Sequence, residues 1–310
     1  MSLSQLPRFV RALTCEPLAV ERGFLDAFVG LVRRRGLEGL SLTGPEIHAE
    51  LGVAMPAKRP AAGADRNIAV VPIYGAISNH AHSMGASTDQ IGAAFDNAVL
   101  DPRVDGIVLD VDSPGGTIGG VPELAEKVFA ARGTKPIVAV ANGLMASAAY
   151  WIGAAADSVV VTRSGEGAGS VGVYLLHEDW TKAMEDEGVK VTEIAAGKFK
   201  TEGAPWKALD ADAEAYLRAR VEEAYGWFTK DVARFRAKAN LPVTSAQVRD
   251  GYGEGRVLNA KAAVNARLAD RVGSLEETVA RMAEKVASRR RSRVATDVEF
   301  RQRSRARGAA

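Results

Sequence analysis

The sequence predicts an α/β fold built on a largely parallel sheet. From residue 67 onward, short apolar runs rich in Val and Ile alternate with stretches of helical periodicity. Strands separated by helices return in the same direction, which gives a parallel sheet. With 310 residues, 47% of them hydrophobic and 25% charged, the chain can bury a core of this size and is not a disordered protein.

We expect the elements of this sheet in chain order. The strands are runs of apolar and β-branched residues, and the helices are amphipathic stretches between them. The predicted strands cover residues 67–78, 106–111, 136–143 and 158–164. The predicted helices between them cover residues 89–100, 121–133 and 147–157. Two further helical stretches, 210–240 and 259–285, follow the sheet, and we expect them to serve in oligomerisation.

Composition divides the chain into three regions. Residues 1–64 hold an amphipathic helical stretch and a linker rich in Pro, Ala and Gly, whereas residues 65–280 hold the alternating strands and helices. Residues 281–310 form a basic tail, with nine Lys and Arg against two acidic residues from residue 285 onward. We expect this tail to be solvated and disordered; the alternative is an arm that binds nucleic acid or an acidic partner.

Charge and cysteine content exclude several functions. A net charge of +2 gives the body of the protein no general affinity for polyanions. The single cysteine, Cys15, cannot form a disulfide within the chain, and a reducing compartment fits it. No Cys and His residues have the spacing of metal ligands, so we expect no metal and no cofactor.

Residues 137–156 carry no charge over a length that could span a membrane. Their β-branched start and the Asn142-Gly143 pair instead predict a buried strand, a turn and a buried helix. The N-terminus lacks the apolar run of a secretory signal. We therefore expect a cytoplasmic protein without a membrane partner.

The first candidate for chemistry follows the second predicted strand. Residues 112–117, DSPGGT, contain a proline and two glycines, which let the backbone turn sharply and expose its N–H groups. Exposed N–H groups are what an oxyanion hole requires, and Gly116 is the candidate donor. The same residues also form ordinary turns, so the motif alone leaves both interpretations open.

Ser147 lies at the break between a predicted strand and the helix after it, among small residues that would let a peptide approach. A serine at this point is commonly a helix N-cap. The alternative is a nucleophile, for which the N–H of Ala148 would be a second oxyanion donor beside that of Gly116.

A serine hydroxyl needs a base within hydrogen-bonding reach before it can act as a nucleophile. His177 is the only histidine after Ser147, but its context predicts an exposed side chain between a strand and a helix. The segment GKFK supplies the alternatives Lys198 and Lys200, because a lysine in an apolar site loses its proton readily enough to act as a base.

Four motifs in this order, DSPGG, LMASAAYW, AGSVGVY and AAGKFKTEGAPW, resemble those of the S49 peptidases, the family of signal peptide peptidase A. The resemblance covers about residues 65–280 and implies the fold that Clp protease shares with the crotonases. It implies a serine endopeptidase with a dyad of Ser147 and Lys200. At the matching positions Ser170 orients the lysine, Gly116 and Ala148 donate to the oxyanion, and Lys198 is variable.

The resemblance also bears on substrate and assembly. A protein or peptide substrate is expected to add as an extended strand along the glycine segment. Its contacts would be Gly115, Thr117, Ile118 and Gly119. Family members form rings, tetramers or octamers, and in some the lysine reaches the serine of a neighbouring protomer. We therefore expect a homo-oligomer.

The segments EPLAVERGFLDAFVGLV and GKFKTEGAPWKAL are similar to those of S49 proteins from head-assembly modules of tailed phages and prophages. There the enzyme trims scaffold or capsid proteins inside the prohead. A host cytoplasmic peptidase is the alternative within the family. Outside peptidase chemistry, the alternatives are a crotonase-like acyl-CoA enzyme and an inactive assembly protein on the same fold.

Residues 167–172 fit the pattern Gly-x-Gly-x-x-Gly, which is typical of dinucleotide-binding turns. A turn of that kind opens a helix, whereas strand-like residues follow here. We therefore expect these glycines to form a tight turn that presents Ser170.

Overall fold

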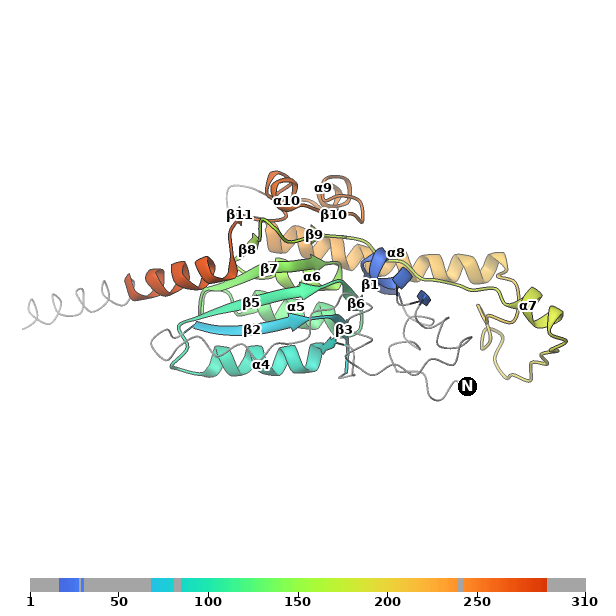
Figure 1. The fold of residues 1–310 in the computed structure, drawn as a ribbon. Helices are drawn as coiled ribbons and strands as arrows, with labels where there is room; N and C mark the ends of the chain where they lie inside the picture. Colours follow the sequence, from blue (N-terminus) through green and yellow to red (C-terminus); the bar gives the residue numbers. More distant parts are fainter. Residues whose placement is uncertain (1–16, 28, 31–67, 81–84, 239–241, 289–310) are drawn as a thin grey trace, which may run out of the picture.

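The computed structural model describes residues 17–27, 29–30, 68–80, 85–238 and 242–288. Its central feature is a sheet in which three neighbouring strands run parallel (Figure 1). These strands are β2 (Ile68–Tyr74), β5 (Gly106–Ser113) and β7 (Ile137–Ala146). They are rich in Val and Ile, as expected for strands covered on both faces. The predicted α/β class with a largely parallel sheet is confirmed.

β7 pairs with a different strand in each of its halves. Its first half pairs in parallel with β8 (Ser158–Val161), and its last three residues pair in parallel with β9 (Gly167–Gly169). Beyond these, β11 (Arg271–Val272) adds in parallel to β8, and β10 (Val257–Leu258) adds antiparallel to β9. The two pairings separate β8 from β9 where β7 approaches its carboxyl end.

A second, smaller sheet lies at the carboxyl end of the first. It has the strand order β1-β6-β3-β4. These strands are β1 (Leu18–Val20), β6 (Gly115–Thr117), β3 (Ala76–Ser78) and β4 (Gly85–Ser87). β3 follows β2, and β6 follows β5, after one residue each. In open α/β sheets, ligands bind at this end of the strands.

Helices cover both faces of the large sheet. On one face are α4 (Thr88–Leu100), α5 (Val121–Ala130), α6 (Ala148–Ala154) and α8 (Ala211–Arg236), which share one apolar core with the strands. Within this core, the rings of Trp151 and Phe228 are stacked with centroids 4.4 Å apart, so α8 is packed on α6. On the other face, Leu275 and Met282 of the helical segment 275–288 pack against apolar side chains of β5, β7 and β8.

The 26-residue helix α8 is about 39 Å long and extends well beyond the sheet (Figure 1). Its N-terminus is capped by Asp210, whose carboxylate accepts the N–H of Ala213 at 2.8 Å. The first half of α8, the short helix α7 (Thr181–Asp186) and the segments around them lie outside the body of the protein. We call residues 175–227 the arm.

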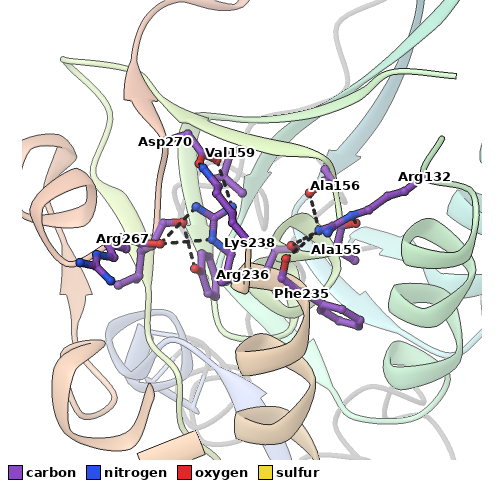
Figure 2. Close-up of polar contacts among 12 residues, drawn as sticks. Arg132, Ala155, Ala156, Val159, Phe235, Arg236, Lys238, Arg267 and Asp270 are labelled. Atoms are coloured by element: carbon purple, nitrogen blue, oxygen red, sulfur yellow. Dashed lines mark hydrogen bonds and ion pairs between the residues drawn. The ribbon is translucent and has the colours of Figure 1, made fainter. Parts of the chain in front are cut away.

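The C-terminal end of α8 is held by buried cations (Figure 2). The guanidinium of Arg132 donates to the carbonyl oxygens of Ala154, Ala155 and Ala156 at the end of α6, and to that of Phe235 in α8. These carbonyls are at the negative ends of helix dipoles, where a cation is stabilising. Arg132 therefore fixes α6 and α8 relative to each other.

Two short helices, α9 (Ser245–Gly251) and α10 (Ala260–Asn265), follow α8. The first has a capping box, in which the Thr244 side chain accepts the N–H of Gln247 and the Gln247 side chain accepts the N–H of Thr244. The sequence predicts one helical stretch over 259–285, but β11 interrupts it, because these two residues pair with β8.

Three boundaries differ from those predicted. The expected turn at Asn142-Gly143 is wrong, because β7 continues through both residues to Ala146. The region 1–64 is not wholly a separate helical appendage: Leu18–Val20 is a strand of the small sheet, although residues 22–27 and 29–30 are helical as predicted. The helix over 275–288 passes residue 280, where the tail was expected to begin. The linker before residue 68 and the basic residues 289–310 lie outside the described residues.

Candidate active site

Ser147 occupies a sharp turn between the end of β7 and the start of α6. Its backbone has φ 54° and ψ −118°, a conformation that L-residues other than glycine rarely adopt. The carbonyl oxygen of Gly169 accepts its N–H at 2.8 Å, and its own carbonyl accepts the N–H of Trp151 at 2.9 Å. Strain of this kind persists only where surrounding hydrogen bonds impose it, and it is concentrated at functional sites.

The Ser147 hydroxyl is not a helix cap. It forms no hydrogen bond with the first turn of α6, and it donates instead to the carbonyl oxygen of Gly172 at 3.4 Å. The side chain is fully buried, with the small residues Ala146 and Ala148 on either side. The N-cap interpretation is therefore wrong, and the hydroxyl remains available for chemistry.

The glycine segment forms strand β6 rather than a simple turn. Gly115 has φ 94°, and a Cβ added to it would come within 2.3 Å of the carbonyl oxygen of Ala19 and 3.0 Å of the amide nitrogen of Ala148. A Cβ on Gly116 would come within 1.8 Å of the carbonyl oxygen of Ile77. Both positions therefore require glycine. The close approach of Gly115 to Ala148 brings the two predicted oxyanion segments together.

Ser170 follows β9 directly and has φ 51°. It is 6% exposed, and its N–H donates to the carbonyl oxygen of Arg256 at 2.8 Å. Because Gly169 is hydrogen-bonded to Ser147, Ser170 is adjacent to the turn that holds the serine. No helix begins at these glycines, which agrees with the predicted tight turn and not with a dinucleotide site.

Asp112 supports this region, and sequence reasoning assigned it no role although it begins the DSPGG motif. Its carboxylate accepts the N–H of Leu144 at 3.1 Å, and a Cβ on Gly143 would meet the same carboxylate at 2.3 Å. The pairing register of β5 and β7 shifts at this point. Burial raises the pKa of Asp112, against the opposing effect of the Leu144 hydrogen bond. The contact fixes the part of β7 that leads to Ser147.

The remaining candidate bases lie apart from Ser147. His177 is half-buried rather than exposed, and its Nε2 is buried without a hydrogen-bond partner among the described residues. Lys198 and Lys200 are exposed on the segment between α7 and α8. Figure 1 shows this segment at the far end of the arm, well away from β6 and α6. The structure of one chain therefore unites Ser147, Ala148, Ser170 and the glycines but does not bring Lys200 to them.

The arm segment that holds Lys200 has an internal hydrogen-bond network centred on Glu193. Its carboxylate accepts from the Thr201 hydroxyl at 2.8 Å and from the Trp206 indole at 2.6 Å, and it pairs with Lys207 at 3.3 Å. The hydrogen bonds from Thr201 and Trp206 lower the pKa of Glu193. Residues on both sides of Lys200 are thus held in a defined loop.

The predicted substrate contacts lie where expected, but their strand edge is not open. Gly115 and Thr117 are in β6, and Ile118 and Gly119 connect it to α5. One edge of β6 pairs with β3 and the other pairs with β1. Sequence reasoning missed this strand, because no signal in three apolar residues near the N-terminus predicts their pairing partner.

Two further searches concern other kinds of site. Within the described part of the chain, no group of three or more His, Cys, Asp and Glu is placed to hold a metal ion. None of the helices in that part is long and apolar enough to cross a membrane.

Comparison with known proteins follows from this geometry. The model of peptidase family S49 matches residues 130–289. The sequence is 27% identical to capsid assembly protease C of Escherichia phage lambda, over 93% of this chain and 68% of that protein. It is also 27% identical to head-tail preconnector protein GP5 of Enterobacteria phage P21, over 90% of this chain and 57% of that protein.

Other matches are more distant. The sequence is 32% identical to the putative protease MJ0651 of Methanocaldococcus jannaschii, over 61% of this chain and 58% of that protein. Among solved structures, a ClpP1 mutant from Listeria monocytogenes has a TM-score of 0.40 and 11% identity, covering 68% of this chain and 94% of that one.

Proposed function

Because the chain belongs to peptidase family S49, we propose that it is a serine endopeptidase in which Ser147 is the nucleophile. The position of Ser147 is the observation that supports this most strongly. Its backbone is strained, its hydroxyl does not cap α6, and two glycines that tolerate no Cβ lie beside it. A serine on a strained turn from strand to helix is typical of a nucleophile.

The proposed mechanism is acyl transfer. The Ser147 Oγ attacks the carbonyl carbon of the scissile bond while a base takes its proton. The N–H groups of Gly116 and Ala148 donate to the oxyanion that forms. The protonated base then protonates the leaving amine, and water hydrolyses the acyl-enzyme by the same route.

We assign the base to Lys200 from the arm of a neighbouring copy of the chain. In one chain the arm extends away from Ser147 (Figure 1), so the lysine of the same chain is not available to it. The arm also has the exposed apolar surface of an interface, with nine of the eleven exposed large hydrophobic side chains among the described residues. They are Leu176, Trp180, Val189, Val191, Ile194, Phe199, Trp206, Tyr216 and Trp227.

Ser170 would orient the incoming lysine. It lies next to the Ser147 turn and is nearly buried, so a neighbouring Lys200 that reaches Ser147 would pass within its range. An amine that enters this enclosed site loses hydration, which favours the neutral form that a general base requires. A closed ring or a stack of dimers would give every serine such a neighbour.

The proposed setting is phage or prophage head assembly in the cytoplasm of a bacterial host. Two similar proteins have names from this setting, and the alignments with them include almost the whole of this chain. Scaffold or capsid protein would then be the substrate. The role of the basic residues beyond 288 stays a prediction, since they lie outside the described residues.

Substitution of the dyad tests the chemistry. We expect Ser147→Ala and Lys200→Ala each to lower peptide or scaffold cleavage by about a thousandfold or more. Lys198→Ala is the matched control, because this exposed lysine is on the same loop. A serine-reactive fluorophosphonate should label the wild type at Ser147, whereas an acyl-CoA enzyme of this fold would not react. Full activity of Lys200→Ala would remove the lysine from the mechanism.

Mixing the two inactive variants tests whether the dyad forms between chains. A site then pairs an intact serine from one variant with an intact lysine from the other. In a randomly mixed ring, about a quarter of the interfaces would have both groups, so about a quarter of wild-type activity should return. If mixed assemblies of normal mass stayed inactive, the base would have to come from the same chain.

A further inference from the structure

The strand edge beside the proposed catalytic serine is filled by the chain's own N-terminal residues. β1 lies between β6 and Tyr174 and runs antiparallel to both. The N–H of Leu18 donates to the carbonyl oxygen of Tyr174 at 2.7 Å, and its carbonyl accepts the N–H of Tyr174 at 3.1 Å. On the other side, the N–H of Glu21 donates to the carbonyl oxygen of Pro114 at 2.6 Å. An extended peptide held on both edges in this way is bound as a protease binds its substrate.

The register of β1 places Ala19 opposite the oxyanion donors. Ala19 pairs with Gly116, and Leu18 pairs with Thr117. In an antiparallel ladder, hydrogen-bonded pairs alternate with non-bonded ones. Because Glu21 is bonded to Pro114, the next bonded pair is that of Ala19 and Gly116, so the Gly116 N–H faces the carbonyl of Ala19.

The position of the Ala19 carbonyl agrees with this register. The space that a Cβ on Gly115 would fill lies 2.3 Å from the Ala19 oxygen and 3.0 Å from the amide nitrogen of Ala148. The Ala19 carbonyl thus lies in the neighbourhood of both proposed donors. This is where the reacting carbonyl of a substrate has to be placed.

We propose that β1 is a pseudosubstrate bound in cis, which fills the peptide groove between β6 and Tyr174 and excludes substrates until it is displaced. The proposal rests on the function proposed above. It also defines the substrate class: an extended apolar segment with a small residue opposite Gly116, as in Leu18-Ala19-Val20. Leu18 and Ala19 are fully buried and Val20 is 2% exposed, so the groove encloses all three side chains.

Burial of Ser147 shows that this state is closed. The side chain of Ser147 is 0% exposed, so a peptide cannot reach it in the described arrangement. β1 contains only three residues, and each hydrogen bond contributes about 1 kcal/mol net, so its pairing is exchangeable. A ligand on the same chain has an effective concentration in the millimolar range. Only a substrate held at a comparable local concentration would therefore displace it.

Amide hydrogen exchange tests the proposal on the full chain. The protein carries Ser147→Ala to prevent cleavage, and the probe is a synthetic peptide of residues 16–22, EPLAVER. At saturating peptide, we expect the Leu18 amide to lose protection at least tenfold, because β1 has left. The Tyr174 amide should stay protected, because the peptide replaces β1 as its partner. An unchanged Leu18 amide at saturation overturns the proposal.

A substitution gives a second, independent readout. In the same Ser147→Ala protein, Leu18→Pro removes the N–H donated to Tyr174, so EPLAVER should bind at least tenfold more tightly. Arg22→Pro is the matched control, because position 22 begins a helix and tolerates proline; its affinity should equal that of the parent. Equal affinity of a folded Leu18→Pro protein overturns the proposal. If that variant does not fold, the exchange experiment decides.

The same measurements separate the pseudosubstrate from the peptidase. Hydrolysis by the wild type with no peptide-dependent change at Leu18 overturns the pseudosubstrate and leaves the peptidase. Release of Leu18 by peptide in a protein whose wild type hydrolyses nothing supports the occupied groove and overturns the peptidase.

Discussion

The guanidinium of Arg236 and the carboxylate of Asp270 form an ion pair of 3.0 Å in which the Arg236 side chain is only 4% exposed. Asp270 also accepts the N–H of Val159 at 2.8 Å and pairs with Lys238 at 2.7 Å. These contacts connect the end of α8 to β8 (Figure 2). Burial alone would raise the pKa of Asp270, but the charge and hydrogen bonds of Arg236 outweigh it and lower this pKa to about 2.

Asp270→Asn should destabilise the protein by about 3 kcal/mol at pH 7, because it leaves the buried Arg236 without its counterion. Urea unfolding measures this loss. Asp186→Asn, which breaks the exposed pair with Lys182, is the matched control and should change stability by less than about 0.5 kcal/mol.

The same pair predicts a pH dependence. The folded pKa of about 2 lies below the ordinary value of 3.8, so the stabilisation is present above the ordinary value and is lost as the pH falls toward 2. The difference in unfolding free energy between wild type and Asp270→Asn should therefore shrink between pH 4 and pH 2. A constant difference over this range would contradict the assignment.

Arg132→Met should lower the unfolding free energy by about 2 to 4 kcal/mol, because carbonyl oxygens of α6 and α8 lose their donor. Since α6 begins at Ser147, cleavage should fall as well. Arg103→Met removes an arginine whose side chain is 86% exposed, and it should alter neither stability nor cleavage. Comparable effects of the two substitutions would show that Arg132 does not hold the helices.

Gly115→Ala should abolish cleavage, with a loss of at least about a hundredfold, because the new Cβ collides with backbone atoms beside the oxyanion donors. Gly133→Ala is its matched control: this glycine has φ 86°, but nothing lies within 4 Å of an added Cβ. It should cost about 1 kcal/mol of stability from backbone strain alone and leave kcat/KM unchanged. Peptide cleavage and urea unfolding of both variants separate close approach from strain.

Glu193→Ala should lower kcat about tenfold while KM stays the same, because Thr201 and Trp206 lose the acceptor that shapes the loop of Lys200. Glu187→Ala alters another exposed glutamate of the arm and should leave both constants unchanged. Glu193→Gln retains an acceptor oxygen and should recover part of the loss. A change in KM alone would place Glu193 in substrate binding instead.

Much of the sheet could be predicted because its strands are continuous runs of Val and Ile, in which burial on both faces leaves little alternative. The sequence also predicted the turn at Ser147, whose neighbours are all small. The predicted break at Asn142-Gly143 failed because that glycine is required by the Asp112 carboxylate, which approaches β7 from β5. A contact between neighbouring strands cannot be distinguished from a turn signal in one sequence.

The candidate site was predictable in part for the same reason. Ser147, Ala148 and Ser170 are brought together by local turns and by the pairing of β7 with β9. The position of β1 depends on partners about a hundred residues away in the chain, at Gly116 and Tyr174, and no local pattern specifies them. The separation of Lys200 from Ser147 depends on the direction of α8, which its amphipathic pattern does not reveal.

The length of the arm has a consequence for when hydrolysis can begin. A solitary chain that holds its base far from its own nucleophile is harmless to the cell, however much of it is synthesised. On the proposed arrangement, turnover would rise more steeply than linearly with chain concentration and would vanish on dilution. Crowding many copies into a confined shell would then be enough to start the reaction, without a separate activating signal.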